Sequence, residues 1–376
     1  MTLPILSIKE KISASCILGS YLDTLGFNNG FWEFNFRQKY KLTHLSAGIL
    51  TNYEILSDFF SKGGFNINLE DWDASDDTIM MIATAKACKK GGSQKDFIDE
   101  YLKIYPLLQE DIRISGITTL NSLKTLSKYK DPKKIIYSDS MGGNGAAMRT
   151  HYIGIHFEDI EKIIEVSIMS SQLTHNHTLG FLGGMIMALF THWAIKDIPP
   201  WKWCDKLIEL NENNTIDKVI EKTTDIYNKY KEDKQKYWDI IYKYRELRVN
   251  RFHLRVREFK FSSDRLDDLY SILYNRKLDD LSRFGGDGLS AVLIAYDSLL
   301  LSIIPKDNPN EELDLKKPDS YMYSWQNLVF LSTLHFGDND TTGAIAGMLY
   351  GALRGFDGIN KNVVNMLEFK DELLKI

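Results

Sequence analysis

Apolar residues recur along most of the chain at intervals of three and four, which is the spacing of one face of an α-helix. The spacing also continues after Thr341 and through much of Thr215–Arg257. Six further stretches show it clearly: Ile8–Gly26, Thr78–Lys90, Lys95–Tyr105, Phe157–Ser171, Phe181–Ile195 and Leu289–Ser302. Proline is scarce, and no series of short alternating strands separated by regular turns occurs. The pattern predicts an all-α protein.

No stretch rich in Ser, Gly or Pro divides the 376 residues into separate units. The most polar break, around Ser262–Arg283, is short, and the segment 305–320 is typical of a polar surface loop. No internal repeat occurs. We therefore expect one compact domain that spans residues 1–376.

Composition and charge narrow the class of protein. The chain is 44% apolar and 26% charged, as soluble globular proteins are, and its net charge of −5 gives no reason to expect nucleic acid as a partner. Cys16, Cys88 and Cys204 lie far apart, which favours reduced thiols in the cytoplasm over disulfides or a zinc site. Charged residues interrupt the apolar N-terminus at Lys9–Lys11, unlike in a signal peptide. The apolar stretch 179–195 is shorter than a membrane span of about 20 residues, so we expect a buried core helix and no membrane.

Four aspartates lie between Asp71 and Asp77, directly before an apolar helix. Ser75 is placed to cap this helix, with Asp76 and Asp77 in its first turn. One acidic residue would be enough to complement the helix dipole, which is worth about 0.3–1 kcal/mol, whereas adjacent carboxylates repel each other unless a cation lies between them. The cluster indicates either a charged helix start or part of a cation site.

A second acidic helix start follows near the other end of the chain. Asp338 and Asp340 precede the apolar helix after Thr341, and no Glu follows at the position that an EF-hand requires. Carboxylate oxygens suit Mg²⁺ or Mn²⁺ rather than zinc. Each cluster alone is compatible with a simple helix start; together they predict two helix starts that meet at a centre for two ions.

Three glycines in four positions, Gly142, Gly143 and Gly145 with Asn144 between them, leave backbone N–H groups free to bind an anion such as a diphosphate. A helix is predicted to begin at Ala146. No Gly-Lys-Ser/Thr sequence follows and no strand–helix–strand unit surrounds the loop, which excludes a Walker loop and a dinucleotide fingerprint. A flexible turn is the alternative interpretation.

Histidine and glutamate supply further candidates. His175 and His177 are two residues apart, a spacing unsuited to one helix face, and no further nitrogen or sulfur ligand stands beside them. A neutral histidine that hydrogen-bonds a ligand, or one satisfied within a loop, fits better than a zinc ligand. Glu33 stands among Phe31, Trp32 and Phe34, where it is either a desolvated acid or base or a surface residue beside packed rings.

Two other patterns concern packing and charge. Basic residues prevail in Lys243–Lys260, which favours a solvated helix face over a patch for an acidic partner. Gly343, Gly347, Gly351 and Gly355 recur every four residues. This spacing favours close packing of one helix against another over a membrane dimer face.

The order of the motifs resembles that of a known family. NNGFWEF, SDDTIM, GGNGAAMR, LTHNHT, IAYD and FGDNDTTGAIAG follow one another as in the ADP-ribosylglycohydrolases, and the resemblance extends from about Ile12 to Gly358. It is strongest to the ADP-ribosylarginine hydrolase branch. It implies an all-helical domain with two Mg²⁺ ions, or Mn²⁺ in some members, that hydrolyses the glycosidic bond between ADP-ribose and an arginine side chain. ADP-ribosylated proteins and ADP-ribose would be the partners, and we expect a monomer.

The resemblance also implies roles for individual residues. The two acidic helix starts would bind the ions: Ser75, Asp76, Asp77 and Asp340 one of them, and Asp338, Asp340 and Thr341 the other. The glycine loop and two other segments would bind the substrate: Gly142, Gly143, Asn144, Gly145 and His175 at the diphosphate, and Phe284, Gly285 and Gly286 near the adenine. Asp76 or Asp77 would take a proton from water, and Glu33 matches an acid that faces the substrate.

Some positions depart from the family pattern. Asn176 stands where proline is common, Leu22 precedes Asp23 where glycine is usual, and the loop after Gly286 lacks a His-Asp pair of the arginine branch. Two alternatives follow, namely an inactive relative that binds ADP-ribose and a hydrolase for serine-linked ADP-ribose. The intact acidic motifs favour an enzyme, and the NNGFWEF segment favours arginine.

Overall fold

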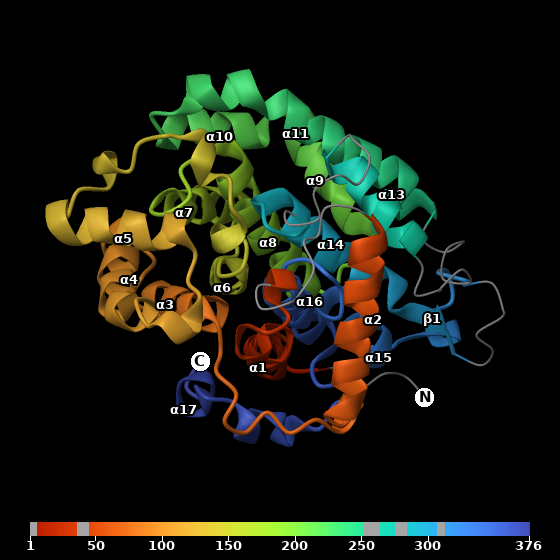
Figure 1. Cartoon of the computed structure of the whole chain (residues 1–376). Helices are drawn as coiled ribbons and strands as arrows, with labels where there is room; N and C mark the ends of the chain where they lie inside the picture. The colour runs from red at the N-terminus through yellow and green to blue at the C-terminus, as the bar shows by residue number, and fades with distance from the viewer. Residues whose placement is uncertain (1–5, 36–44, 252–262, 275–283, 307–312) are drawn as a thin grey trace.

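The computed structural model describes residues 6–35, 45–251, 263–274, 284–306 and 313–376. Helices dominate these residues, and the only strands among them are a short antiparallel pair, so the predicted all-α class is confirmed. The elements shown in Figure 1 are α1 (Ile8–Phe27), α2 (Leu45–Ser61), α3 (Asp76–Lys89), α4 (Gln94–Leu108), α5 (Ile117–Tyr129), α6 (His151–His156), α7 (Ile160–Gln172), α8 (Thr178–Ile195), α9 (Trp203–Glu212), α10 (Thr215–Thr223), α11 (Tyr227–Leu247), α13 (Ser263–Tyr274), α14 (Gly288–Leu301), β1 (Ile303–Pro305), β2 (Tyr321–Tyr323), α15 (Trp325–Thr333), α16 (Asn339–Arg354) and α17 (Lys370–Leu373).

Local capping determines where several helices begin. Ser7 and Glu10 form a reciprocal capping box at the start of α1, and Ser93 and Asp96 do the same for α4. The prediction of one helix over 157–171 was wrong at its start. Phe157 closes the short helix α6, and Asp159 caps α7 by accepting a hydrogen bond from the Lys162 N–H at 2.8 Å. Apolar spacing continues across this break, so it did not reveal the cap.

The glycine loop also ends differently from the prediction. Asn144–Ala146 form a 3₁₀-helix, a turn follows, and the next α-helix begins only at His151. A helix start at Ala146 was therefore wrong. The tighter 3₁₀ turn at Asn144–Ala146 ends after three residues and does not continue as a regular α-helix.

Helices α1 and α16 pack against each other in antiparallel orientation at the centre of the molecule (Figure 1). A Cβ atom added at Gly347 would lie 2.3 Å from the Leu18 carbonyl oxygen, and one at Gly351 would lie 2.5 Å from the carbonyl of Ala14. The predicted close packing is confirmed for Gly343, Gly347 and Gly351. Gly355 instead ends α16 with a φ of +61°, which a residue with a side chain rarely adopts.

Helix α8 is the most apolar part of the core. It is the one helix among the described residues that is long and apolar enough to cross a membrane, but 94% of it is buried inside the protein. Its close approach to α14, where a Cβ at Gly183 would lie 2.1 Å from the Gly288 carbonyl oxygen, leaves no room for lipid. The prediction of a buried core helix is confirmed.

One residue of the basic stretch Lys243–Lys260, Arg248, has a structural role that neither interpretation foresaw. Arg248 is buried and donates to Asp297 with Nε at 2.7 Å, and Arg265 donates to the same carboxylate at 2.9 Å. Burial raises the pKa of Asp297, but the two arginines outweigh this effect and hold it below its usual range. The triad joins α11, α13 and α14. Residues 252–262 lie outside the described part of the chain.

Candidate active site

Segments far apart in the sequence meet at one pocket of about 480 Å³. The start of α3 contributes Asp76 and Asp77, the start of α16 contributes Asp338 and Asp340, and the short helix Glu33–Asn35 contributes Glu33. The glycine loop and other predicted residues line the same pocket: Gly143, Asn144, Gly145, His175, Gly286 and Thr341. The structure thus brings together both acidic clusters and the predicted diphosphate loop.

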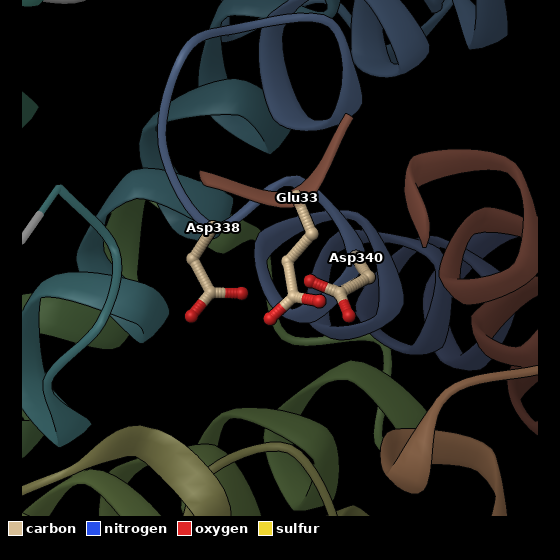
Figure 2. A group of neighbouring side chains, drawn as sticks. All are labelled: Glu33, Asp338 and Asp340. Atoms are coloured by element: carbon tan, nitrogen blue, oxygen red, sulfur yellow. The ribbon is translucent and has the colours of Figure 1, made fainter. Parts of the chain in front are cut away.

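Glu33 lies with the metal-ligand candidates. Its carboxylate oxygen and those of Asp338 and Asp340 are all within 4.8 Å of one another, and Figure 2 shows Glu33 between the two aspartates, reaching in from a separate segment. The Phe34 N–H donates to the Gly337 carbonyl at 3.1 Å and so holds the Glu33 segment beside the start of α16. The sequence made Glu33 a candidate acid or base that faces the substrate but did not indicate a metal ligand, because nothing local points to a contact across three hundred residues.

The two acidic helix starts are linked by hydrogen bonds. Ser75 caps α3 by accepting from the Asp77 N–H at 3.1 Å, as predicted. The Thr341 hydroxyl donates to Asp77 Oδ1 at 3.3 Å, and the Thr341 N–H donates to Asp340 at 2.9 Å. Thr341 therefore contacts an acid from each cluster.

Asp23 is a further member of the site that the sequence did not assign. It lies in α1, is wholly buried, and accepts hydrogen bonds from the Ser75 hydroxyl at 2.6 Å and from the backbone and side chain of Thr78. Because the Ser75 hydrogen is directed at Asp23 and the Asp77 N–H occupies one lone pair, the remaining lone pair of Ser75 is free for a ligand. The available signal was that Asp23 is the only charged residue in the second half of α1.

The segment before α3 is clamped from the C-terminal end of the chain. Glu368 accepts from the Ala74 N–H at 3.0 Å and forms a bidentate pair with Arg113, whose guanidinium also donates to the Ala74 carbonyl at 2.9 Å. The backbone N–H and the backbone carbonyl of Ala74, the residue before Ser75, are thus both hydrogen-bonded to side chains. Neither Arg113 nor Glu368 belongs to a motif, so the sequence did not indicate them.

Burial and mutual repulsion disfavour the charged form of these acids. Burial, followed by the charge of Asp340, raises the pKa of Asp23 to about 7. Burial likewise raises the pKa of Asp76 to about 7 and that of Asp77, Asp340 and Glu33 well above the usual range, with neighbouring carboxylates as a further cause. Without a cation, the cluster tends to hold protons.

Two carboxylate oxygens of the cluster, Asp77 Oδ2 and Asp338 Oδ1, are buried without a hydrogen-bond partner. Buried polar atoms are rarely left in this state. An all-oxygen donor set with unused lone pairs fits a hard divalent cation such as Mg²⁺ or Mn²⁺. The residues present therefore fit the metal that the family resemblance implies.

The glycine loop is tied to the acidic cluster. Asn144 donates from Nδ2 to Asp338 at 2.7 Å and to the Gly285 carbonyl at 2.8 Å. On the far side, the Gly288 N–H donates to the Gly142 carbonyl at 3.1 Å. The loop, the start of α14 and the start of α16 consequently form one connected wall of the pocket.

His175 is a neutral side chain in the pocket wall. Burial, and to a smaller degree the charge of Arg149, lowers its pKa to about 3. Its Nδ1 lies 2.9 Å from the Thr174 hydroxyl, and its ring packs directly on Gly145. His177 has a separate role, since its Nδ1 accepts from the Leu179 N–H and caps α8. No histidine takes part in a group of metal-ligand candidates among the described residues.

Phe284 lies behind the pocket and not in its wall. Its side chain is fully buried against His335 and Phe336, and its backbone carbonyl accepts from the Asp338 N–H at 2.9 Å. Gly285 has a φ of +84°, and an added Cβ would lie 3.1 Å from the Asp338 Cβ, so the turn requires glycine. These two residues position the start of α16.

Gly286 separates the acidic pocket from a neighbouring pocket of about 530 Å³. The two pockets share Phe34, Gly143 and Gly286. The second has an apolar and aromatic part, with Leu179, Tyr237, Ile240, Leu273 and Tyr274, and a polar part, with Asp139, Ser140, Asp287 and Ser290. An acidic pocket beside a pocket with aromatic and aliphatic walls, with a glycine loop between the two, suits a long ligand with an anionic centre.

Comparison with known proteins assigns the chain to a family. The family model described as ADP-ribosylglycohydrolase matches residues 7–376. The chain belongs to the ADP-ribosylglycohydrolase family. It is 32% identical over 388 residues to the ADP-ribosylhydrolase ARH1 of Dictyostelium discoideum, a match that covers 96% of this chain and 91% of that protein. The recognition made from the motif order is therefore confirmed.

Other relatives agree with this assignment. A protein of Acanthamoeba polyphaga mimivirus named as an ADP-ribosyl glycohydrolase is 31% identical over 351 residues, which cover 89% of this chain and 62% of the viral protein. A solved structure, an ADP-ribosylglycohydrolase-related protein complex, superposes with a TM-score of 0.52 over 97% of this chain at 16% identity, which shows the shared fold. Membership of the family supports an ADP-ribose glycohydrolase activity for this chain.

Proposed function

We propose that the protein releases ADP-ribose from ADP-ribosylated arginine side chains by hydrolysing the N-glycosidic bond with the help of bound Mg²⁺. The observation that carries this proposal is the convergence of Glu33, Asp76, Asp77, Asp338 and Asp340 in one pocket next to the glycine loop. A buried acidic cluster supplies cation binding and proton transfer, and the adjoining loop supplies an anion subsite. The similarity to the Dictyostelium ADP-ribosylhydrolase supports the reaction class.

The metal ions would be held by the residues of the two acidic helix starts and their hydroxyl neighbours: Ser75, Asp76, Asp77, Asp338, Asp340 and Thr341. Glu33 is a further carboxylate within reach of Asp338 and Asp340. When bound, divalent cations lower the pKa of water and stabilise negative charge that develops on sugar oxygens.

The substrate would extend across both pockets. Its diphosphate would lie at Gly142–Gly145, where backbone N–H groups and the neutral His175 ring provide donors without a charge. Its adenosine would occupy the second pocket, beyond Gly286, whose Tyr237 and Leu273 offer flat and aliphatic surfaces. The ribose that carries the acceptor would then face the carboxylates.

In the chemical step, Asp76 or Asp77 takes a proton from the attacking water while the water oxygen bonds to the anomeric carbon of the ribose. The bond between that carbon and the guanidine nitrogen breaks, and the proton passes to the departing guanidine. Glu33, a half-buried acid that lines the same pocket, relays this proton. Free ADP-ribose and an unmodified arginine are the products.

An arginine acceptor suits the mouth of the pocket. Glu110 and Asp111 are exposed and line the pocket, as does the half-buried Glu33. A guanidinium group is a cation at neutral pH, whereas a serine hydroxyl carries no charge, so acidic walls favour the former.

The test is release of free ADP-ribose from ADP-ribosylarginine and from a peptide with ADP-ribosylated serine, each with Mg²⁺ and with EDTA. We expect turnover of the arginine substrate that EDTA stops and Mg²⁺ or Mn²⁺ restores. Faster turnover of the serine peptide would show that the preferred acceptor is serine and not arginine. Binding of ADP-ribose without turnover of either substrate would show an inactive relative, and full activity in EDTA would exclude the role of metal.

A further inference from the structure

A buried arginine lies directly behind the glycine loop. The side chain of Arg149 is wholly shielded from solvent, donates to the Gly145 carbonyl at 2.9 Å and to the Ser170 carbonyl at 3.0 Å, and stacks on the Tyr101 ring with 4.8 Å between the guanidinium carbon and the ring centroid. Its Nε has no hydrogen-bond partner. Among the described residues, no carboxylate forms an ion pair with it.

Burial of a charge without a counter-ion is costly, because carbonyl dipoles and an aromatic ring replace only part of the lost hydration. The other buried arginines among the described residues, Arg113 and Arg248, are compensated by Glu368 and Asp297, respectively. Arg149 has no such partner, so its field is not neutralised locally and acts on the nearest cavity. In a medium of low polarity that field extends further than it would in water.

The nearest cavity is the proposed diphosphate subsite. Gly145 and His175 both line the acidic pocket, and a Cβ at Gly145 would lie 2.5 Å from the His175 ring. Arg149 therefore lies directly behind Gly145, which lines the pocket together with His175. The Arg149 charge, after burial, also lowers the pKa of His175, as expected of a positive charge close to that ring.

We propose that Arg149 is a positioning residue that provides the positive potential of the diphosphate subsite from behind, without touching the ligand. It also engages the Gly145 carbonyl oxygen, which would repel phosphate oxygens if it faced the pocket. This inference rests on the proposed function only in placing a diphosphate at the loop. It identifies the missing counter-ion of Arg149 as the substrate itself.

ADP and adenosine are suitable probes because they differ only in the diphosphate. Their dissociation constants are measured by calorimetry in the presence of Mg²⁺ for the unaltered protein, for Arg149→Gln and for Arg149→Lys. Gln removes the charge but keeps an N–H donor for Gly145, whereas Lys keeps the charge. We expect Arg149→Gln to weaken ADP binding roughly 30-fold, as loss of one unscreened charge would, and to change adenosine binding less than about threefold. Arg149→Lys should recover most of the loss.

A role confined to holding the loop in shape gives a different result. In that case Arg149→Gln and Arg149→Lys would weaken ADP binding equally, or Arg149→Gln would weaken the binding of ADP and of adenosine to the same degree. Either result would show that the inference is wrong. Should Arg149→Gln not fold, Arg149→Met, which keeps the packing on Tyr101, takes its place. An unaltered protein that does not prefer ADP over adenosine also overturns the inference. Failure to cleave ADP-ribosylarginine would instead refute the proposed function and leave the ADP comparison to decide on Arg149.

Discussion

The acidic side chains of this site repel one another when they are charged, and either protons or a cation relieve that repulsion. Asp77 and Asp340 are buried, near each other and bonded through Thr341, and the pKa of each lies well above its usual range. A protonated carboxyl group and an amide have nearly the same shape and no charge. Replacement of one acid by its amide should therefore affect cation binding far more than folding.

Asp340→Asn tests this expectation. We expect hydrolysis to fall by roughly a thousandfold or more, because the cations lose counter-charge, while the melting temperature without metal stays the same or rises. Differential scanning fluorimetry with and without Mg²⁺ should show that Mg²⁺ no longer stabilises the variant. Asp371→Asn, at an exposed position on α17, is the control and should behave like the unaltered protein. An active Asp340→Asn variant would contradict the metal site.

At the scale of elements, the contact between α1 and α16 positions half of the site. Close approach along Gly343, Gly347 and Gly351 sets the start of α16 beside Gly26, where an added Cβ would lie 2.5 Å from the Asn339 carbonyl oxygen. The same packing brings Asp23, on α1, to the start of α3. Small residues at the helix contact thus determine the separation of the carboxylates.

Gly351→Ala should force these helices apart, because the new Cβ would lie 2.5 Å from the backbone of Ala14 and Ser15, which cannot rotate away. We expect a loss of about 2 kcal/mol in the free energy of unfolding, typical of overpacking, measured by urea denaturation. Gly116→Ala is a matched control, since its Cβ would meet nothing closer than 3.8 Å and its φ of −56° suits alanine. Equal stability of the two variants would show that α1 and α16 can adjust.

At the scale of the whole molecule, the acidic cluster couples stability to pH and metal. The pKa of Asp23 and of Asp76 is about 7 in the folded protein and about 4 in an unfolded chain. From pH 4 to 7 the unfolded chain therefore loses protons that the folded protein keeps, so these groups reduce stability as pH rises. Buried His151, His175 and His335, whose pKa falls to about 3, act in the opposite direction as pH falls below 6.5.

The increase in melting temperature on adding Mg²⁺ reports the contribution of the acidic cluster alone, because the buried histidines contribute equally to stability with and without metal. We expect this increase to be small at pH 5.5, where protons compete for the carboxylates, and larger by about 5 °C at pH 8. Thermal unfolding at both pH values with Mg²⁺ and with EDTA measures it. An increase that does not change with pH would mean that the cation does not bind to these acids.

Local sequence was sufficient for the helices, for the cap at Ser75 and for the two acidic segments, because periodicity and capping act between residues a few positions apart. The same local rules missed the break at Phe157, since apolar spacing does not stop at a cap. They also predicted a helix start at Ala146. There, hydrogen bonds from Asn144 to Asp338 and to the Gly285 carbonyl hold a 3₁₀ turn instead.

The sequence by itself determined the all-α class, the family and the residue types of the site, because these depend on neighbouring residues and on the order of motifs. Only the tertiary structure placed Glu33 beside Asp338 and Asp340, directed Asp23 at Ser75, and set Arg149 without a counter-ion behind Gly145. Such contacts join residues that are distant along the chain, or depend on which groups water can reach. Both are consequences of packing, which no local pattern records.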